Sequence, residues 1–306
     1  MQELTKELDS RFEELGYQFR VVSAHHLHDL QEAIEGDLGR GLLSETLYRE
    51  WLTDFSFRLP DILPQAKSLV VVAVPQPQII VKFTWQGKPR PIMIPPTYVS
   101  SEQTNKRVGD TLSSVLGPRG YRVAKAALPL KLLAVRSGLG DYGRNNICYV
   151  AGMGSFHRLV AFYSEFRPPE DVWRDPKMMG FCQGCQACLQ ACPTGAISSE
   201  RFLINAERCI TFHNERPGKF PTWVEDSWHN CLTGCLYCQK ICPQNISFLD
   251  WVEGGYLFTE EETSLILAST LPNRLPAETV KKLDRLGLLD YIGVLPRNLS
   301  ILLRRD

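Results

Sequence analysis

Nine of the ten cysteines in this 306-residue chain lie between Cys182 and Cys242. The first run places Cys182, Cys185, Cys188 and Cys192 at the spacing Cys-x2-Cys-x2-Cys-x3-Cys, and a proline follows the last cysteine. In iron–sulfur proteins with this spacing, three thiolates bind one [4Fe-4S] cluster and the fourth binds a second cluster. The run therefore predicts redox chemistry based on two clusters.

A second run, Cys235, Cys238 and Cys242 followed by Pro243, lacks one cysteine at its start, which Cys209 can supply. The exchange of fourth ligands then predicts two complete sets. The first cluster takes Cys182, Cys185, Cys188 and Cys242, and the second takes Cys192, Cys209, Cys235 and Cys238. Zinc sites usually combine two pairs of ligands, so zinc or reduced thiols are the weaker alternatives.

Two cysteines remain outside these sets. We interpret Cys231 as a spare thiol, with an alternative cluster ligand as the other reading, because each cluster already has four ligands. Cys148 stands far from the runs in the sequence and is interpreted as a small buried hydrophobic residue.

The composition is that of a globular protein, with 44% hydrophobic and 22% charged residues. Because 34 basic residues balance 34 acidic ones, we do not expect the net charge of the protein to attract nucleic acid or an anionic membrane. The start of the chain has no basic segment followed by an apolar run, and no stretch approaches the roughly 18 apolar residues of a membrane span. We therefore expect a cytoplasmic protein, in which clustered cysteines indicate metal or redox chemistry before disulfides.

Hydrophobic periodicity predicts strands that alternate with helices up to about residue 165. The expected helices are 4–15, 27–34, 104–116 and 129–137. The expected strands are 18–23, 68–74, 121–124 and 159–163, with a hairpin formed by 79–85 and 91–94 around Gln86 and Gly87. A loop with three glycines follows the last of these helices, from Gly138 to Asn146. This order predicts an α/β domain with a mixed sheet.

Three regions are expected. Residues 1–170 form the α/β domain for cofactor and substrate, 171–250 form a ferredoxin-like double [4Fe-4S] module, and 251–306 form a short helical tail. In the tail, Thr259 and Glu262 have the spacing of a capping box, and a second helix is expected from residue 277 to 286.

The glycine loop, Gly-Leu-Gly-Asp-Tyr-Gly-Arg-Asn from Gly138 to Asn145, resembles the Gly-Leu-Gly-x-x-Gly-Lys-Asn loop of the epoxyqueuosine reductases. The pair Gly154 and Ser155 resembles the next turn of that family, and Leu295-Pro296-Arg297-Asn298-Leu299 resembles its Leu-Arg-Asn segment. The pattern of both cysteine runs with the single Cys209 between them is also similar. The resemblance covers the chain from about residue 60 almost to its end.

This resemblance implies a nitroreductase-like α+β or α/β fold that holds a cobalamin, with electrons passing along the clusters to cobalt. We also expect an electron donor such as a ferredoxin or flavodoxin as a partner, and no membrane. The residues that it implies for cofactor binding are Gly138, Gly140, Gly143, Asn145, Gly154 and Ser155.

The family's catalytic aspartate, counted back from Gly138 without gaps, falls on Ala124, which cannot transfer a proton. The catalytic acid is therefore unknown, and Lys125, Tyr98 and Asp141 are weak candidates for a substitute. Three hypotheses follow. The favoured one is a cobalamin-dependent iron–sulfur reductase of an unknown small molecule or modified nucleoside. The others are an electron carrier that reduces a partner's cofactor, and an epoxyqueuosine reductase that acts on tRNA with a substitute acid.

Overall fold

The computed structural model describes residues 2–99, 101–168 and 170–305. The chain forms two compact units, each built from two separate segments. Unit 1 comprises Met1–Pro75 and Glu102–Cys185, and unit 2 comprises Gln76–Ser101 and Gln186–Asp306. This division differs from the three consecutive regions expected from the sequence, because residues 76–101 leave the first region and the C-terminal tail belongs with most of the cysteine module.

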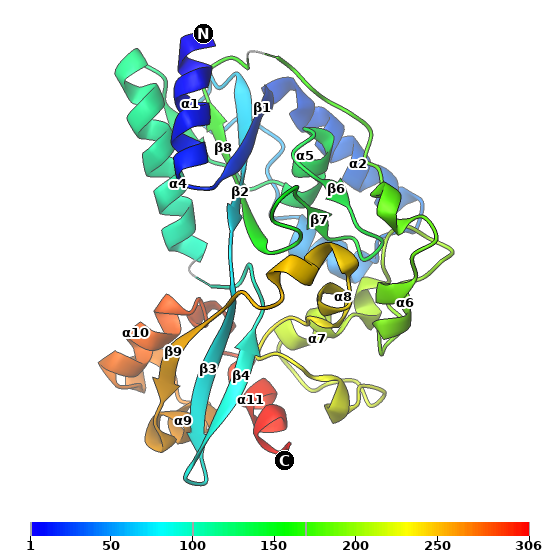
Figure 1. Cartoon of the computed structure of the whole chain (residues 1–306), viewed down its shortest axis with the longest axis vertical. Coiled ribbons are helices and arrows are strands. Elements are labelled where there is room, and N and C mark those ends of the chain that lie inside the picture. The colour runs from blue at the N-terminus through cyan, green and yellow to red at the C-terminus, as the bar shows by residue number, and fades with distance from the viewer. Residues whose placement is uncertain (1, 100, 169, 306) are drawn as a thin grey trace. The chain divides into compact units, whose positions relative to one another are not determined.

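The centre of unit 1 is a four-stranded sheet in the order β1-β2-β8-β5. Its strands are β1 (Gln18–Ser23), β2 (Ser68–Pro75), β8 (His157–Ser164) and β5 (Val123–Lys125). Every pairing in this sheet is antiparallel, so the expectation of a mixed sheet is wrong here. Figure 1 shows β1, β2 and β8 side by side.

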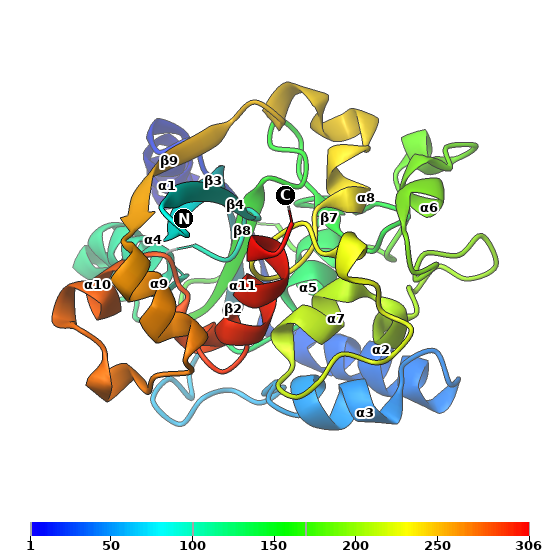
Figure 2. The same ribbon diagram turned by 90° about the horizontal axis from the view of Figure 1, so that it is seen from below.

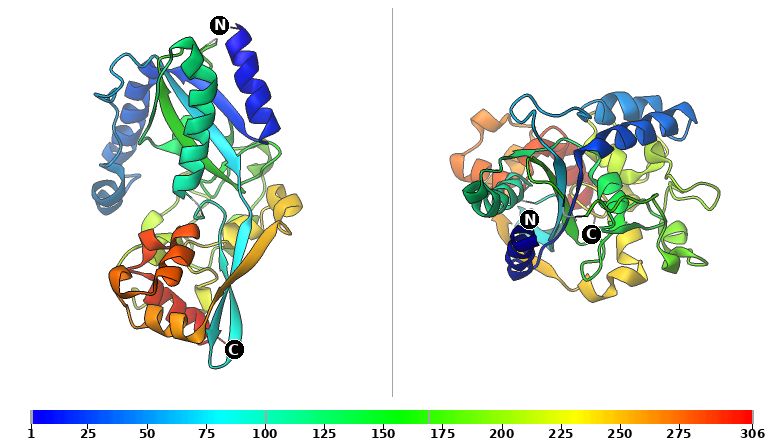
Figure 3. Two further views of the ribbon diagram at one scale, coloured as in Figure 1. Left: turned by 90° about the vertical axis from the view of Figure 1, so that its left-hand side faces the viewer. Right: turned by 90° about the horizontal axis from the view of Figure 1, so that it is seen from above.

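Helices cover both faces of this sheet. α1 (Gln2–Glu14) and α4 (Ser101–Leu116) pack on the face that carries Val70, Val72 and Val74 of β2. α2 (Leu27–Gly39) and α5 (Leu130–Arg136) pack on the other face. Successive residues of a strand point to opposite faces, so the continuous apolar run of β2 supplies both cores. The helices on the two sides are visible in Figure 3.

Two short elements of unit 1 were not expected. A helical segment consists of α3 (Glu45–Leu47) and one π-helical turn (Tyr48–Leu52). The glycine loop contains a small hairpin of β6 (Asp141–Tyr142) and β7 (Cys148–Tyr149). Its pairing is too short to give a periodic signal in the sequence.

Unit 2 contains a three-stranded sheet in the order β4-β3-β9. The expected hairpin is confirmed as β3 (Gln78–Trp85) and β4 (Lys88–Ile94), joined at Gln86 and Gly87, which both have positive φ. β9 (Val252–Phe258) pairs parallel with β3, so the C-terminal tail begins with a strand that the sequence pattern did not predict. The burial pattern of β9 does not alternate, which explains why periodicity missed it.

Three helices follow: α9 (Glu260–Leu267), α10 (Ala277–Arg285) and α11 (Leu295–Leu303). The capping box is confirmed, because Thr259 accepts from the backbone of Glu262 and the Glu262 carboxylate accepts in return. These helices and the hairpin share one core, formed by Val81, Phe83, Ile94, Phe258, Ile266, Leu283, Leu295 and Leu299. Figure 2 shows α9 directly after β9, with α10 and α11 on either side of it.

The cysteine module consists of short helices joined by tight turns. α6 (Ala187–Ala191) packs on α8 (Tyr237–Lys240), and α7 (Ile210–Glu215) follows Cys209. The other short helical segments of the described residues are of the 3-10 type: Ala24–His26, Gly117–Arg119, Gly180–Cys182, Ala206–Arg208, Asp226–Trp228, Pro243–Phe248, Pro272–Arg274 and Leu289–Tyr291. Within the described residues, no helix is long and apolar enough to cross a membrane.

Candidate redox site

The glycine loop in unit 1 is held by its own hairpin and by Arg174. The backbone nitrogen of Gly143 donates to the carbonyl oxygen of Ile147, which closes the turn between β6 and β7. Arg174 donates from Nη2 to the carbonyl oxygen of Gly140 at 2.6 Å and to Asp141 Oδ1 at 2.7 Å. The loop is therefore fixed on both sides by protein contacts.

Gly140 and Gly143 are required by packing inside the loop. A Cβ on Gly140 would lie 2.5 Å from the carbonyl oxygen of Tyr149 and 2.7 Å from Cys148 Sγ. A Cβ on Gly143 would lie 2.5 Å from Asn145 Oδ1. Real side chains do not approach so closely, so both positions need glycine whether or not a cofactor binds.

The other predicted cofactor residues have structural tasks as well. Gly138 has φ +77°, a left-handed conformation that follows the end of α5 and favours glycine. The buried Asn145 side chain donates to the Tyr149 hydroxyl and accepts from the backbone of Ile147. Gly154 bridges to Val150, and Ser155 is buried beside it. The structure brings Gly138, Gly140, Gly143 and Asn145 together in one loop, and their role toward a cofactor stays a prediction.

Ala124 and two of the candidate acids lie on or near the sheet of unit 1. Ala124 is buried in the core, where its neighbour across the ladder is Tyr163. Lys125 Nζ forms an exposed ion pair with Glu102 at 3.0 Å. Asp141 Oδ1 forms an ion pair with Arg174 Nη2 at 2.7 Å.

Tyr98, the third candidate acid, belongs to unit 2. Its hydroxyl donates a short hydrogen bond to Glu215 Oε1. Burial, and then the charge of Glu215, raise the pKa of Tyr98 well above its usual value. The tyrosine and Glu215 therefore form a partly buried polar pair near Cys209, whose charge also raises the Tyr98 pKa.

A contact that the sequence did not predict joins the glycine loop to the first cysteine run within unit 1. Arg144 donates from Nη2 to the carbonyl oxygen of Cys182 at 2.8 Å and from Nε to that of Cys185 at 3.2 Å. The backbone of Tyr142 also exchanges hydrogen bonds with Lys177 and Met179, just before the run. The only sequence signal for this contact was the basic residue in the glycine motif.

The boundary between the units falls between Cys185 and Gln186, inside the first cysteine run. Cys182 and Cys185 thus belong to unit 1, whereas Cys188 and Cys242 belong to unit 2. The ligand set of the first cluster remains a prediction from the spacing.

In unit 2 the structure gathers Cys192, Cys209 and Cys235, three of the four predicted ligands of the second cluster. Burial is the largest cause that raises the pKa of Cys235, to about 11, and the charges of Cys209 and Cys192 add to this rise. Burial and then the charge of Cys192 raise the pKa of Cys209. Partly buried thiols whose charges act on one another resist ionisation unless a cation compensates them, and bound iron deprotonates such thiols, so the donor set fits a cluster.

No disulfide joins any of the ten cysteines, all of which lie within the described residues. Within the described residues, no three His, Cys, Asp or Glu side chains come close enough to hold a single metal ion. A [4Fe-4S] cluster takes one cysteine thiolate on each iron, so its four ligands stand further apart than those of one ion.

The two spare cysteines are buried. Cys148 is in the core of unit 1, where burial raises its pKa to about 12 and keeps the thiol neutral. Cys231 is 1% exposed, and its Sγ donates to Asn230 Oδ1 at 2.9 Å. Burial in the core agrees with the interpretation of Cys148, and the interpretation of Cys231 as a spare thiol stays a prediction.

The C-terminal segment 295–299 supports the cysteine module. Arg297 lies over the ring of Phe220, at 3.7 Å from its centroid, and donates to the carbonyl oxygen of His213. Asn298 is buried and donates to the carbonyl oxygens of Asn214 and Leu232, both at 2.9 Å. The resemblance in this segment therefore reflects residues that hold the module in shape.

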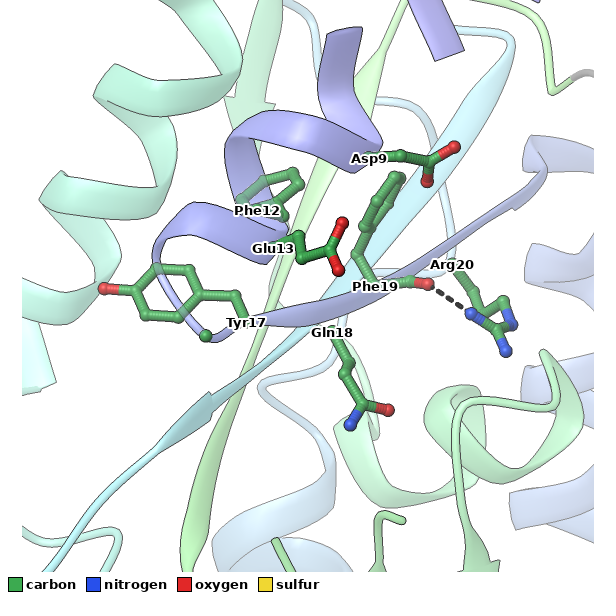
Figure 4. A pocket seen from close by; sticks show the side chains of 8 residues that line it. Asp9, Phe12, Glu13, Tyr17, Gln18, Phe19 and Arg20 are labelled. Atoms are coloured by element: carbon green, nitrogen blue, oxygen red, sulfur yellow. Dashed lines mark hydrogen bonds between the residues drawn. The ribbon is translucent and has the colours of Figure 1, made fainter. Parts of the chain in front are cut away.

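An open pocket of about 400 Å³ lies between α1 and β1 in unit 1. Figure 4 shows its lining side chains, among them Asp9, Glu13, Gln18 and Arg20. No cysteine and no residue of the glycine loop lines it, so we assign no redox role to this pocket.

Comparison with known proteins places these features in a family context. Residues 181–245 match the family described as a 4Fe-4S double cluster binding domain, which confirms the prediction of two [4Fe-4S] clusters. Among solved structures, the fold is similar to epoxyqueuosine reductase from Bacillus subtilis, with a TM-score of 0.69 at 23% identity over 99% of this chain and 81% of that chain. The enzyme from Streptococcus thermophilus gives a TM-score of 0.67 at 18% identity over 98% and 80%.

Curated relatives carry the same name. Epoxyqueuosine reductase from Synechococcus is 32% identical over 148 residues, which are 47% of this chain and 44% of that protein. The protein from Francisella cf. novicida is 30% identical over 46% of this chain and 39% of its own length. The protein from Leadbetterella byssophila is 26% identical over 80% of this chain and 81% of its own length. The chain thus spans about two fifths of the first two relatives.

These comparisons confirm the expected combination of an α+β fold, a double-cluster module and helices in the C-terminal tail. We conclude that this chain is related in sequence and fold to the epoxyqueuosine reductases and carries a 4Fe-4S double cluster binding domain.

Proposed function

We propose that this protein is an iron–sulfur reductase, which takes single electrons from a ferredoxin or flavodoxin and passes them through two [4Fe-4S] clusters to an acceptor. The observation that carries this proposal is the gathering of Cys192, Cys209 and Cys235 from three separate segments of unit 2. Chemistry that needs single electrons at low potential is a typical use of such clusters.

Within this proposal, Arg144 couples the glycine loop to the start of the first cluster-binding run. Its guanidinium holds the carbonyl oxygens of Cys182 and Cys185, and it places a positive charge next to two predicted ligands. Both effects would favour a negatively charged cluster at this point.

The resemblance to the epoxyqueuosine reductases supports a corrinoid as the acceptor, with the glycine loop as its holder. When bound, a corrinoid supplies a strongly reducing cobalt centre. The loop itself gives this no further support, because atoms of the loop occupy the space beside Gly140 and Gly143.

Reduction of a substrate also needs a proton, and the residues near the expected position do not supply an evident one. Ala124 is buried and apolar, Lys125 is paired with Glu102, and Asp141 is paired with Arg174. This observation favours a second candidate function, in which the protein is an electron carrier that reduces a cofactor on a partner.

The proposal is tested by purifying the protein without oxygen, reconstituting its clusters and adding cob(II)alamin. We expect the absorption and electron paramagnetic resonance (EPR) spectra of cobalt to change on binding. Intact clusters with an unchanged cobalt signal would exclude the corrinoid and favour the carrier.

Epoxyqueuosine reduction is a third candidate, because the relatives bear that name and one similar structure contains a tRNA stem loop modified with epoxyqueuosine. It predicts that the reconstituted protein converts epoxyqueuosine to queuosine in tRNA. A negative result with active clusters would leave another substrate or the carrier function.

A further inference from the structure

Asn230 connects a predicted cluster ligand to the spare thiol in unit 2. Its Nδ2 donates to Cys235 Sγ at 3.3 Å, and its Oδ1 accepts from Cys231 Sγ at 2.9 Å. The same Oδ1 accepts from the backbone nitrogen of Leu236 at 2.9 Å, and Nδ2 also reaches the carbonyl oxygen of Trp228 at 3.5 Å. Both the nitrogen and the oxygen of the side-chain amide are therefore hydrogen-bonded.

These partners define which way the amide faces. A flipped amide would turn its NH₂ group toward the backbone N–H of Leu236, where two donors would face each other. The orientation that satisfies Leu236 points the N–H of Asn230 at the sulfur of Cys235.

Cys231 fits the role of a fixed donor better than that of a ligand. It is 1% exposed, and its S–H is directed at Asn230 Oδ1.

We propose that Asn230 is a positioning residue that raises the reduction potential of the second cluster, and that Cys231 holds its amide in place. This inference rests on the proposed function, since it needs a cluster bound through Cys235. Reduction adds one electron from a ferredoxin-type donor to the cluster, and no bond forms or breaks. An N–H donor on a ligand sulfur stabilises the added negative charge, so the reduced state becomes easier to reach.

The main experiment is a redox titration of the reconstituted protein, followed by EPR, for Asn230→Asp and for wild type. The substitution keeps the size and the oxygen acceptor but replaces the N–H donor with a negative charge. We expect the potential of one cluster to fall while the other is unchanged. The matched control is Asn273→Asp, which makes the same charge change at an exposed position and should move neither potential.

Cys231→Ala is the second variant. It should keep the full iron content and shift the potential of the same cluster in the same direction, by less than Asn230→Asp does. Loss of half the iron would show that Cys231 is a ligand and would overturn the proposal.

A third measurement covers the case in which Asn230→Asp does not fold. Wild-type protein labelled with [15N]asparagine should show coupling between 15N and a reduced cluster in pulsed EPR, because the hydrogen bond delivers spin density to the amide. Absence of this coupling would overturn the proposal. If the wild type binds no clusters, the proposed function fails. If it binds two and Asn230→Asp leaves both potentials unchanged, only this inference fails.

Discussion

Arg144 Nη2 donates to the carbonyl oxygen of Cys182 across 2.8 Å, which joins the glycine loop to the first cysteine run within unit 1. The turn that contains Arg144 lies between two strands of only two residues each, β6 and β7. The long side chain of Arg144 thus links this small hairpin to a segment that lies 38 residues further along the chain.

Replacing Arg144 should loosen the first cysteine run. Hydrogen bonds to a charged group contribute about 1.5–3 kcal/mol, so Arg144→Met should speed amide exchange in residues 177–185 and release iron from one cluster faster. Arg144→Lys should have an intermediate effect, because lysine keeps the charge but not the forked geometry. Amide hydrogen exchange and the rate of iron release measure these effects.

Arg122→Met, which removes an exposed arginine of the same unit, is the control. Equal effects of Arg122→Met and Arg144→Met would refute the proposed role of Arg144 in holding the first cysteine run.

Cys209 and Cys148 make a matched pair of cysteine substitutions. Cys209→Ala removes a predicted ligand of the second cluster, so iron should fall from about eight to about four per chain. Cys148→Ala removes a thiol from the core of unit 1 and should leave the iron content unchanged, at a moderate cost in stability. Iron and sulfide analysis after reconstitution compares the cluster content of the two variants. Equal iron loss in the two variants would contradict the ligand assignment.

Gly140→Ala should destabilise unit 1 because its Cβ would collide with Tyr149 and Cys148. Overpacking of this kind costs about 1–3 kcal/mol of unfolding free energy. Gly39→Ala, at the end of α2, meets no atom within 4 Å and should be neutral or slightly stabilising. Urea unfolding of both variants gives the comparison. A Gly140→Ala protein as stable as wild type would show that the loop rearranges easily.

Asn298→Ala should weaken the attachment of α11 to the cysteine module. The buried carbonyl oxygens of Asn214 and Leu232 would lose their donor, at a cost of about 1–3 kcal/mol for each unsatisfied group. We expect lower stability of unit 2 and faster loss of the second cluster on dilution into chelator. Ser300→Ala, on the same helix, serves as the control, and a similar loss there would assign the effect to the helix in general.

His157 makes the stability of unit 1 dependent on pH. Burial lowers its pKa to about 4, although a hydrogen bond with the backbone of Gly154 opposes this, whereas an unfolded histidine titrates near about 6.5. As pH falls below about 6.5, the unfolded chain takes up the proton first, so stability decreases until the folded state also titrates near pH 4. From pH 7 to pH 5 the loss should be about 2 kcal/mol.

Urea unfolding at both pH values, for wild type and His157→Gln, tests this dependence. The variant should lose about 2 kcal/mol less than wild type over the same interval, because glutamine carries no titrating proton. If both proteins lose the same free energy, another group dominates the acid response.

The sequence by itself determined the chemistry of the cysteine runs and most of the local elements. The spacing of Cys182, Cys185, Cys188 and Cys192 is a local property, because tight turns of two or three residues decide which thiolates can reach one cluster. The apolar run of β2 and the capping box at Thr259 are local in the same sense, since short-range sterics and hydrogen bonds fix them.

Only the tertiary structure decided how distant segments combine. Periodicity gave no sign that β9 pairs with β3, because the partners are separated by more than half the chain and the strand is not amphipathic. The same holds for the hydrogen bond from Arg144 to the carbonyl oxygen of Cys182, and for the hydrogen bond from Asn298 to that of Leu232. Such contacts depend on where whole elements pack, so no local sequence pattern encodes them. The need for glycine at positions 140 and 143 is likewise a tertiary property, because it comes from atoms of Tyr149, Cys148 and Asn145 that pack against these positions.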